Sequence, residues 1–272
     1  TDEEAAAFKL DPHLVALMWA EPFYSKVLRP ITKVRTESIP TAGVLAKDGE
    51  VKMWWNPKFL ASLNAAQTKG LLKHECLHLV FEHTTTRRHE PHLIWNYATD
   101  LAINSLIPME ELPEGGLVPG VAFKTLTEDD KLKMGAEAVG RYERVSAKIA
   151  SFPKGESAEW YFAELQEVAD DIQSGNGEPG DGESGEGEGS GPGMPGPVDD
   201  HSGWDELSDE ERELVSGKVK QILEEAVKEC DASGQWGSVS APTRKKLREM
   251  VAKDIPWQSV LKQFCGMLRR AN

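Results

Sequence analysis

Two histidines four residues apart, with a glutamate directly after the first, constrain this chain more than any other feature of its sequence. Residues 74–78 read His-Glu-Cys-Leu-His, inside a segment (65–83) whose apolar residues and few breakers predict a helix. On a helix both imidazoles lie on one face, one turn apart, and can reach one tetrahedral metal ion at about 2.0–2.1 Å. Glu75 projects about 100° away, where it can meet a water on that ion. The alternative is a surface helix that carries two histidines by coincidence.

A catalytic zinc site needs a third protein ligand and one open position. His83 is a poor candidate, because nine residues along a straight helix turn it about 180° away from His74. His89 and His92 follow in a polar connection and are predicted to be exposed, although either can fold back. We favour Asp100, for the reason given next.

Polar residues form a stripe on the predicted helix 95–107, which is otherwise apolar. Asn96, Asp100 and Asn104 fall at positions i, i+4 and i+8. A polar stripe that faces a core needs partners, and a metal with its surrounding hydrogen bonds supplies them. The alternative is a stripe that faces solvent. We predict Asp100 as the third ligand, and Asn96 and Asn104 as contacts of the ligands or the substrate.

His201 is a further candidate for the catalytic machinery. It stands in Asp-Asp-His-Ser-Gly-Trp, residues 199–204, directly after a glycine-rich stretch. One interpretation is a capping turn that docks Trp204. The other is that the chain loops back, so that His201 stabilises a tetrahedral oxyanion or fills the open metal position.

The charge and composition divide the chain into three parts. Residues 174–198 contain ten glycines, and residues 155–211 hold 18 acidic residues and no Lys or Arg, whereas the rest holds 27 acidic and 31 basic residues. The glycine-rich residues 174–198 bury too little apolar surface to fold alone. We predict a core over 1–173, a disordered linker or long loop over 174–199, and a C-terminal helical segment over 200–272 that packs on the core.

The same composition excludes several classes of protein. An acidic tract disfavours non-specific binding to nucleic acid. No apolar run approaches the roughly 18–20 residues of a membrane helix. Three cysteines are too few for a disulfide framework, so we expect a reducing, cytoplasmic location.

The predicted fold class is α+β and mostly helical. Residues 41–46 and 51–56 read as strands, and the Asp-Gly between them predicts a hairpin that precedes the motif helix. Asn56 and Pro57 predict a helix start, and Ser208 with Glu211 matches a capping box. Helices are predicted at 12–25, 65–83, 95–107, 157–172, 209–230, 242–253 and 257–269.

The chain resembles zincin-type metallopeptidases, and more closely the metallopeptidase domain at the N-terminus of bacterial and phage VWA-like proteins. The matching stretches are 73–78, 95–104, 157–161 and 201–204. The resemblance implies a zincin-like fold, a zinc peptidase acting on proteins or peptides, and partnership with a MoxR-type AAA ATPase and a VWA-like domain. It also implies that strand 51–55 offers an edge to an extended substrate.

The predicted reaction is peptide hydrolysis with Zn²⁺ on His74, His78 and Asp100. Zinc lowers the pKa of its water towards about 7, and Glu75 takes the proton and delivers it to the leaving amine. Cys76 is predicted to face the core rather than the metal. Two alternatives are an inactive zinc-binding scaffold or adaptor and a hydrolase of non-peptide amides, such as a deamidase.

Overall fold

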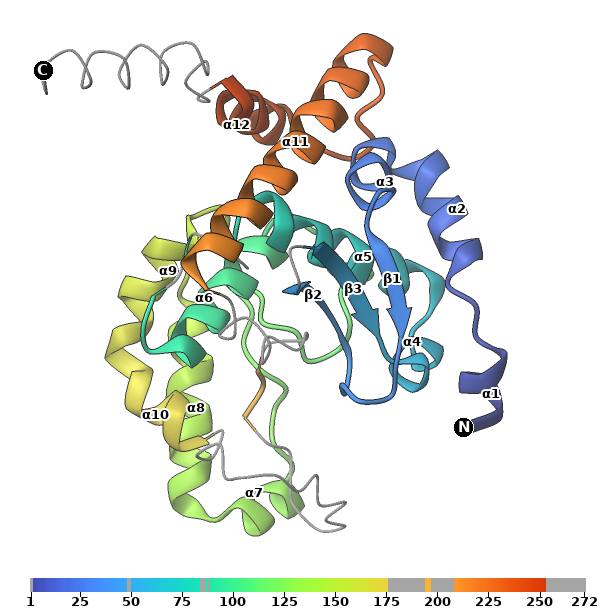
Figure 1. Cartoon of the computed structure of the whole chain (residues 1–272). Coiled ribbons are helices and arrows are strands. Elements are labelled where there is room, and N and C mark those ends of the chain that lie inside the picture. Colours follow the sequence, from blue (N-terminus) through green and yellow to red (C-terminus); the bar gives the residue numbers. More distant parts are fainter. Residues whose placement is uncertain are drawn as a thin grey trace, which may run out of the picture.

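The computed structural model describes residues 2–47, 50–83, 87, 89–175, 194–196 and 208–252. This part of the chain is mostly helical and contains one small three-stranded sheet, which agrees with the predicted α+β class (Figure 1). Among the described residues, no helix has both the length and the apolar character that crossing a membrane requires.

Three helices, three strands and a second series of helices follow one another along the chain. The first part comprises α1 (Asp2–Ala7), α2 (Asp11–Ala20), α3 (Pro22–Leu28), β1 (Thr32–Arg35), β2 (Ala42–Lys47) and β3 (Glu50–Trp55). The second part comprises α4 (Pro57–Ser62), α5 (Ala65–Val80), α6 (His92–Asn104), η1 (Met109–Glu111), α7 (Glu128–Met134), α8 (Ala136–Ala150), α9 (Ala158–Leu165), η2 (Gln166–Val168), α10 (Ala169–Gly175), α11 (Asp209–Ser233) and α12 (Ala241–Ala252).

The sheet has the order β1-β3-β2. β2 and β3 pair antiparallel, with Lys47 opposite Glu50, which confirms the predicted hairpin. β1 was not predicted; it pairs parallel to β3 on the other side. The expectation that strand 51–55 offers a free edge to a substrate is therefore wrong, because β3 has a neighbour on both sides. The outer strands are β1 and β2.

Side-chain caps fix the helix starts that the sequence predicts. The Asn56 side chain accepts the Lys58 backbone N–H at the start of α4, and Ser208 forms a capping box with Glu211 at the start of α11. Caps of this kind contribute about 1 kcal/mol each. The predicted helix 12–25 is in fact two helices, α2 and α3, because Pro22 has no N–H and disfavours helical geometry at Glu21.

The buried apolar residues form two hydrophobic clusters. One is built from α2, α3, the sheet, α5 and α11; the other from α6, α8, α9 and α10. Trp55 and Trp95 are buried, and Trp54 is half-buried. Cys76 is fully buried, as expected, and burial raises the pKa of its thiol.

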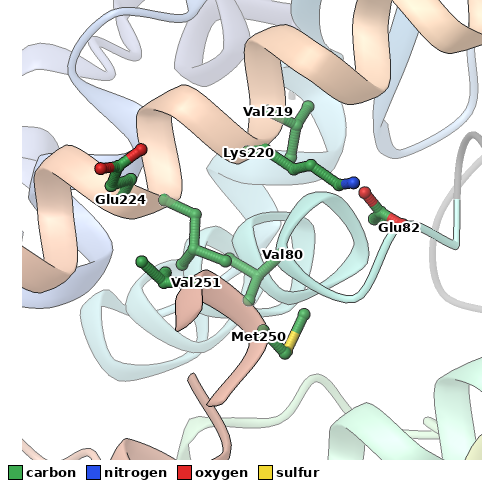
Figure 2. A pocket seen from close by; sticks show the side chains of 8 residues that line it. Val80, Glu82, Val219, Lys220, Glu224, Met250 and Val251 are labelled. Carbon is green, nitrogen blue, oxygen red and sulfur yellow. The ribbon is translucent and has the colours of Figure 1, made fainter. Parts of the chain in front are cut away.

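Helices α11 and α12 lie over the C-terminal end of α5 (Figure 1). A small, largely apolar pocket of about 200 Å³ remains between them, with Val80 and Met250 among its walls (Figure 2). The Ser216 hydroxyl of α11 donates to Glu82 at its rim, 2.8 Å away. The part of the chain after the glycine-rich stretch therefore supports the helix that carries the histidines. The predicted helix 257–269 lies outside the described residues.

Candidate metal centre

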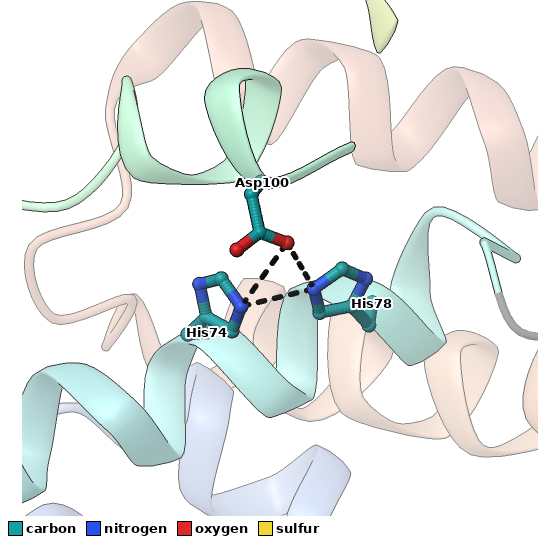
Figure 3. A group of neighbouring side chains, drawn as sticks. All are labelled: His74, His78 and Asp100. Carbon is teal, nitrogen blue, oxygen red and sulfur yellow. Dashed lines mark hydrogen bonds and ion pairs between the residues drawn. The ribbon is translucent and has the colours of Figure 1, made fainter. Parts of the chain in front are cut away.

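His74 and His78 on α5 and Asp100 on α6 converge on one point (Figure 3). The two Nε2 atoms lie 3.0 Å apart. Asp100 Oδ1 lies 3.7 Å from His74 Nε2 and 3.4 Å from His78 Nε2. Asp100 and His78 are completely buried, and His74 is 3% exposed. In the described part of the chain, this is the one group of three His, Cys, Asp or Glu side chains spaced to hold a metal ion.

The distances between the donor atoms fit a tetrahedral zinc ion. Ligands about 2.0–2.1 Å from a tetrahedral centre lie about 3.3 Å from one another. The three observed separations, 3.0, 3.4 and 3.7 Å, lie on both sides of this value. Two imidazoles and one carboxylate are also a donor set that zinc accepts. The residues present therefore fit the ion that the motif predicts.

Asn104 orients His74. Its amide Nδ2 donates to the backbone carbonyl of Leu117 at 2.8 Å, so its Oδ1 is the atom that faces His74 Nδ1, also at 2.8 Å. An amide oxygen only accepts hydrogen bonds, so Nδ1 of His74 carries the proton. Nε2 then presents a lone pair to Asp100 and His78. This is the arrangement that ligating histidines commonly have.

The four remaining predicted residues differ in their placement. Glu75 is completely buried on α5, between the two histidines in sequence. Asn96 is buried one turn before Asp100 on α6, and its Oδ1 has no hydrogen-bond partner among the described residues. Thus only Asn104, of the two asparagines, contacts a histidine of the triad. Cys76 stays outside the group, and His201 lies outside the described residues.

His83 lies closer to the centre than a straight helix allows. Helix α5 ends at Val80, and Glu82 adopts a left-handed conformation with φ 57°. The His83 backbone N–H donates to the His78 carbonyl, which with the bond from Glu82 N–H to Leu79 closes a Schellman turn. The His83 ring therefore comes to 5.4 Å from the His78 ring, centroid to centroid, yet outside the ligand group. His89 is exposed, as predicted, whereas His92 is half-buried.

A buried cluster of charges anchors α5 next to His74. Lys73 Nζ lies 2.9 Å from Glu21 and 2.7 Å from Glu111, and the side chain of Lys73 is 1% exposed. Lys69 adds a second ion pair to Glu111 at 2.6 Å. Burial alone would raise the pKa of Glu111, but hydrogen bonds and charge from Lys69 and Lys73 outweigh it and lower that pKa below its ordinary value. Glu21 also accepts the backbone N–H of Ser238, 2.8 Å away.

This cluster holds η1 against α5. Gly70 makes the approach possible, since a Cβ there would overlap the backbone carbonyl of Glu111. The loop that follows η1 carries Leu117, whose carbonyl orients Asn104 and through it His74. Sequence reasoning missed these residues. The only available signal was a lysine directly before the first histidine of the motif.

Comparison with known proteins assigns the chain to a family. Residues 9–272 match the family model described as "Putative metallopeptidase domain". The chain belongs to this family. Searches of curated proteins and of solved structures gave no match. The matched region includes both helices that carry the triad, and the family supports a metal-dependent peptidase as the class of function to test.

Proposed function

We propose that this protein is a zinc-dependent metallopeptidase in which His74, His78 and Asp100 hold the ion. The observation that carries the proposal is the convergence of two imidazole nitrogens and one carboxylate oxygen, all within 3.7 Å of one another, from two helices. Three protein ligands leave one tetrahedral position open, as catalytic zinc sites do, whereas structural sites have four.

Glu75 is proposed as the general base. When bound, zinc acts as a Lewis acid and lowers the pKa of water to about 7. The Glu75 carboxylate takes a proton from the attacking water as oxygen bonds to the peptide carbon. It then gives that proton to the amide nitrogen as the C–N bond breaks, so the products are a carboxylic acid and an amine. Asn104 keeps the His74 ring in its orientation throughout.

One feature supports binding of an extended peptide. Strand β2 lies against α5 and is an outer strand of the sheet, so it replaces β3 as the proposed edge for strand addition. Asn96, one turn before Asp100 on α6, is proposed as a polar contact beside the metal ligands rather than as a substrate contact, because its Oδ1 is buried.

The test compares the wild type with Glu75→Gln on a library of proteome-derived peptides read by mass spectrometry. We expect both proteins to bind about one zinc ion per chain, and Glu75→Gln to cleave about 10²–10⁴-fold more slowly. Glu213→Gln, an exposed position on α11, is the matched control and should cleave at the wild-type rate. Equal cleavage by wild type and Glu75→Gln would contradict the assignment of the base.

The second candidate is a zinc-binding scaffold without activity. The observation that favours it is the burial of all three ligands, at most 3% exposed. In that case zinc removal lowers the melting temperature, and the zinc-loaded wild type cleaves nothing in the same library. Zinc-dependent cleavage that disappears in Glu75→Gln decides for the peptidase.

A further inference from the structure

Helix α2 exposes an apolar stripe on its outer face. Val15, Met18 and Trp19 fall at positions i, i+3 and i+4 and are 54%, 50% and 79% exposed. The opposite face of the helix is used for packing, since Leu17 is 1% exposed and α2 lies against α3 and α5. Exposed tryptophan at this level is unusual, and clustered apolar residues on a surface mark interaction sites.

Two hollows flank this stripe, one on each side of Met18. The larger measures about 640 Å³ and extends from Trp19 across α3 to the loop around Trp236. The smaller measures about 270 Å³ and lies between Val15 and α3. Both include Met18 and Arg29, so they adjoin each other, and the two hollows with the stripe between them are hereafter the α2–α3 surface.

The charged residues that line the α2–α3 surface are all basic. They are Lys26, Arg29, Lys33 and Arg244, and no Asp or Glu lines either hollow in the described part of the chain. Glu229 pairs with both Lys26 and Arg29, at 3.0 and 3.1 Å, which still leaves two cations against one carboxylate. Arg29 keeps a side-chain exposure of 66% despite this pair.

We propose that the α2–α3 surface binds an acidic amphipathic helix of a partner protein. A concave surface that combines exposed apolar side chains with basic ones is complementary to a helix whose apolar stripe is flanked by carboxylates. The two hollows on either side of Met18 can each receive a side chain of the bound helix, from positions one or two helical turns apart. A second copy of this chain fits poorly, because a symmetric contact would set the same cations against each other.

The surface is separate from the metal centre. In Figure 1, α2 lies at the outer side of the molecule, and α3 and the sheet stand between it and α6. A bound partner therefore leaves the triad uncovered. The inference does not depend on the proposed function, and variants on α2 should keep any peptidase activity.

The experiment pans a phage-displayed library of helix-forming peptides on the full chain and counter-screens it on Trp19→Ala. We expect the Trp19-dependent peptides to carry net negative charge and apolar residues at i, i+3 or i+4, and i+7. A synthetic copy of one such peptide should bind at least about tenfold more weakly to Trp19→Ala and to Arg29→Glu. Its binding should also weaken as salt rises. Leu132→Ala, at a position 82% exposed on α7, is the control and should stay within about twofold.

Four results would overturn the inference. The first is the absence of any Trp19-dependent peptide, and the second is a set of such peptides with net positive charge. The third is Trp19-dependent binding to phosphatidylserine vesicles in place of peptides, which would make this a membrane surface. The fourth is a wild-type dimer in sedimentation that Trp19→Ala converts to a monomer, which would mean that a second copy covers it.

Discussion

Replacing Asn104 by alanine should weaken zinc binding without removing a ligand. The change deletes the acceptor of the His74 Nδ1–H bond and the donor to the Leu117 carbonyl, both 2.8 Å long. His74 is only 3% exposed, so bulk water does not replace the lost partner. The imidazole is then free to rotate or to move its proton to Nε2, the atom that must bind the ion.

The expected magnitude is a 10–100-fold loss of zinc affinity, the usual effect of removing a partner of a ligating histidine. This corresponds to about 1.4–2.7 kcal/mol. It also agrees with the roughly 1–3 kcal/mol cost of leaving a buried donor unpaired. The assay is competition for zinc with a chromophoric chelator at constant pH, with the free energy of unfolding measured in parallel by urea denaturation.

Asn56→Ala is the matched control. Asn56 is also a mostly buried asparagine, but it caps α4 and has no contact with the triad. Its loss should lower stability by about 1 kcal/mol and leave zinc affinity unchanged. If Asn104→Ala binds zinc as tightly as Asn56→Ala does, His74 is not held by Asn104 for metal binding, and the argument from the tautomer fails.

Three further predictions concern the anchoring of α5. Gly70→Ala should lower stability by about 1–3 kcal/mol or more in urea denaturation, because the new Cβ overlaps the Glu111 backbone; Gly217→Ala, with open space around it, should not destabilise. Lys73→Met should cost about 3 kcal/mol, since it leaves two carboxylates buried beside an apolar side chain, and a loss under 1 kcal/mol would contradict this. The ion pairs of Glu111 lower its pKa in the folded protein below the ordinary value of 4.5. The contribution of Glu111 to the free energy of unfolding is therefore present above pH 4.5 and is lost as the pH falls through its pKa in the folded protein. Between pH 6 and pH 3.5 the free energy of unfolding should therefore fall more for the wild type than for Glu111→Gln. Equal decreases in the two proteins would contradict a stabilising role of the Glu111 carboxylate.

The proximity of the three candidate ligands was easier to predict from the sequence than the fold around them. The motif histidines had to share a face of α5, since their spacing is one helical turn. Asp100 was recognisable because a charged residue on an apolar helix requires a partner. In the structure the predicted ligands lie together, with Asn104 beside them. Local periodicity was enough for these residues.

Features that depend on contacts distant in sequence were not predictable in the same way. β1 is four residues long and largely polar, and only its pairing makes it a strand; for that reason β3 was wrongly expected to be an edge. The approach of His83 depends on where α5 stops and on a left-handed residue at Glu82. The bond from Asn104 to Leu117 depends on a loop whose path the sequence pattern does not indicate.

X-ray absorption at the zinc edge, on the wild-type protein loaded with one equivalent of zinc, tests the central claim most directly. We predict scattering from nitrogen and oxygen alone at about 2.0–2.1 Å, with an imidazole signal that corresponds to two histidines. In His78→Ala the imidazole signal should correspond to one histidine. Failure to bind stoichiometric zinc, or a sulfur shell at about 2.3 Å, would contradict the assignment of His74, His78 and Asp100 as the metal ligands.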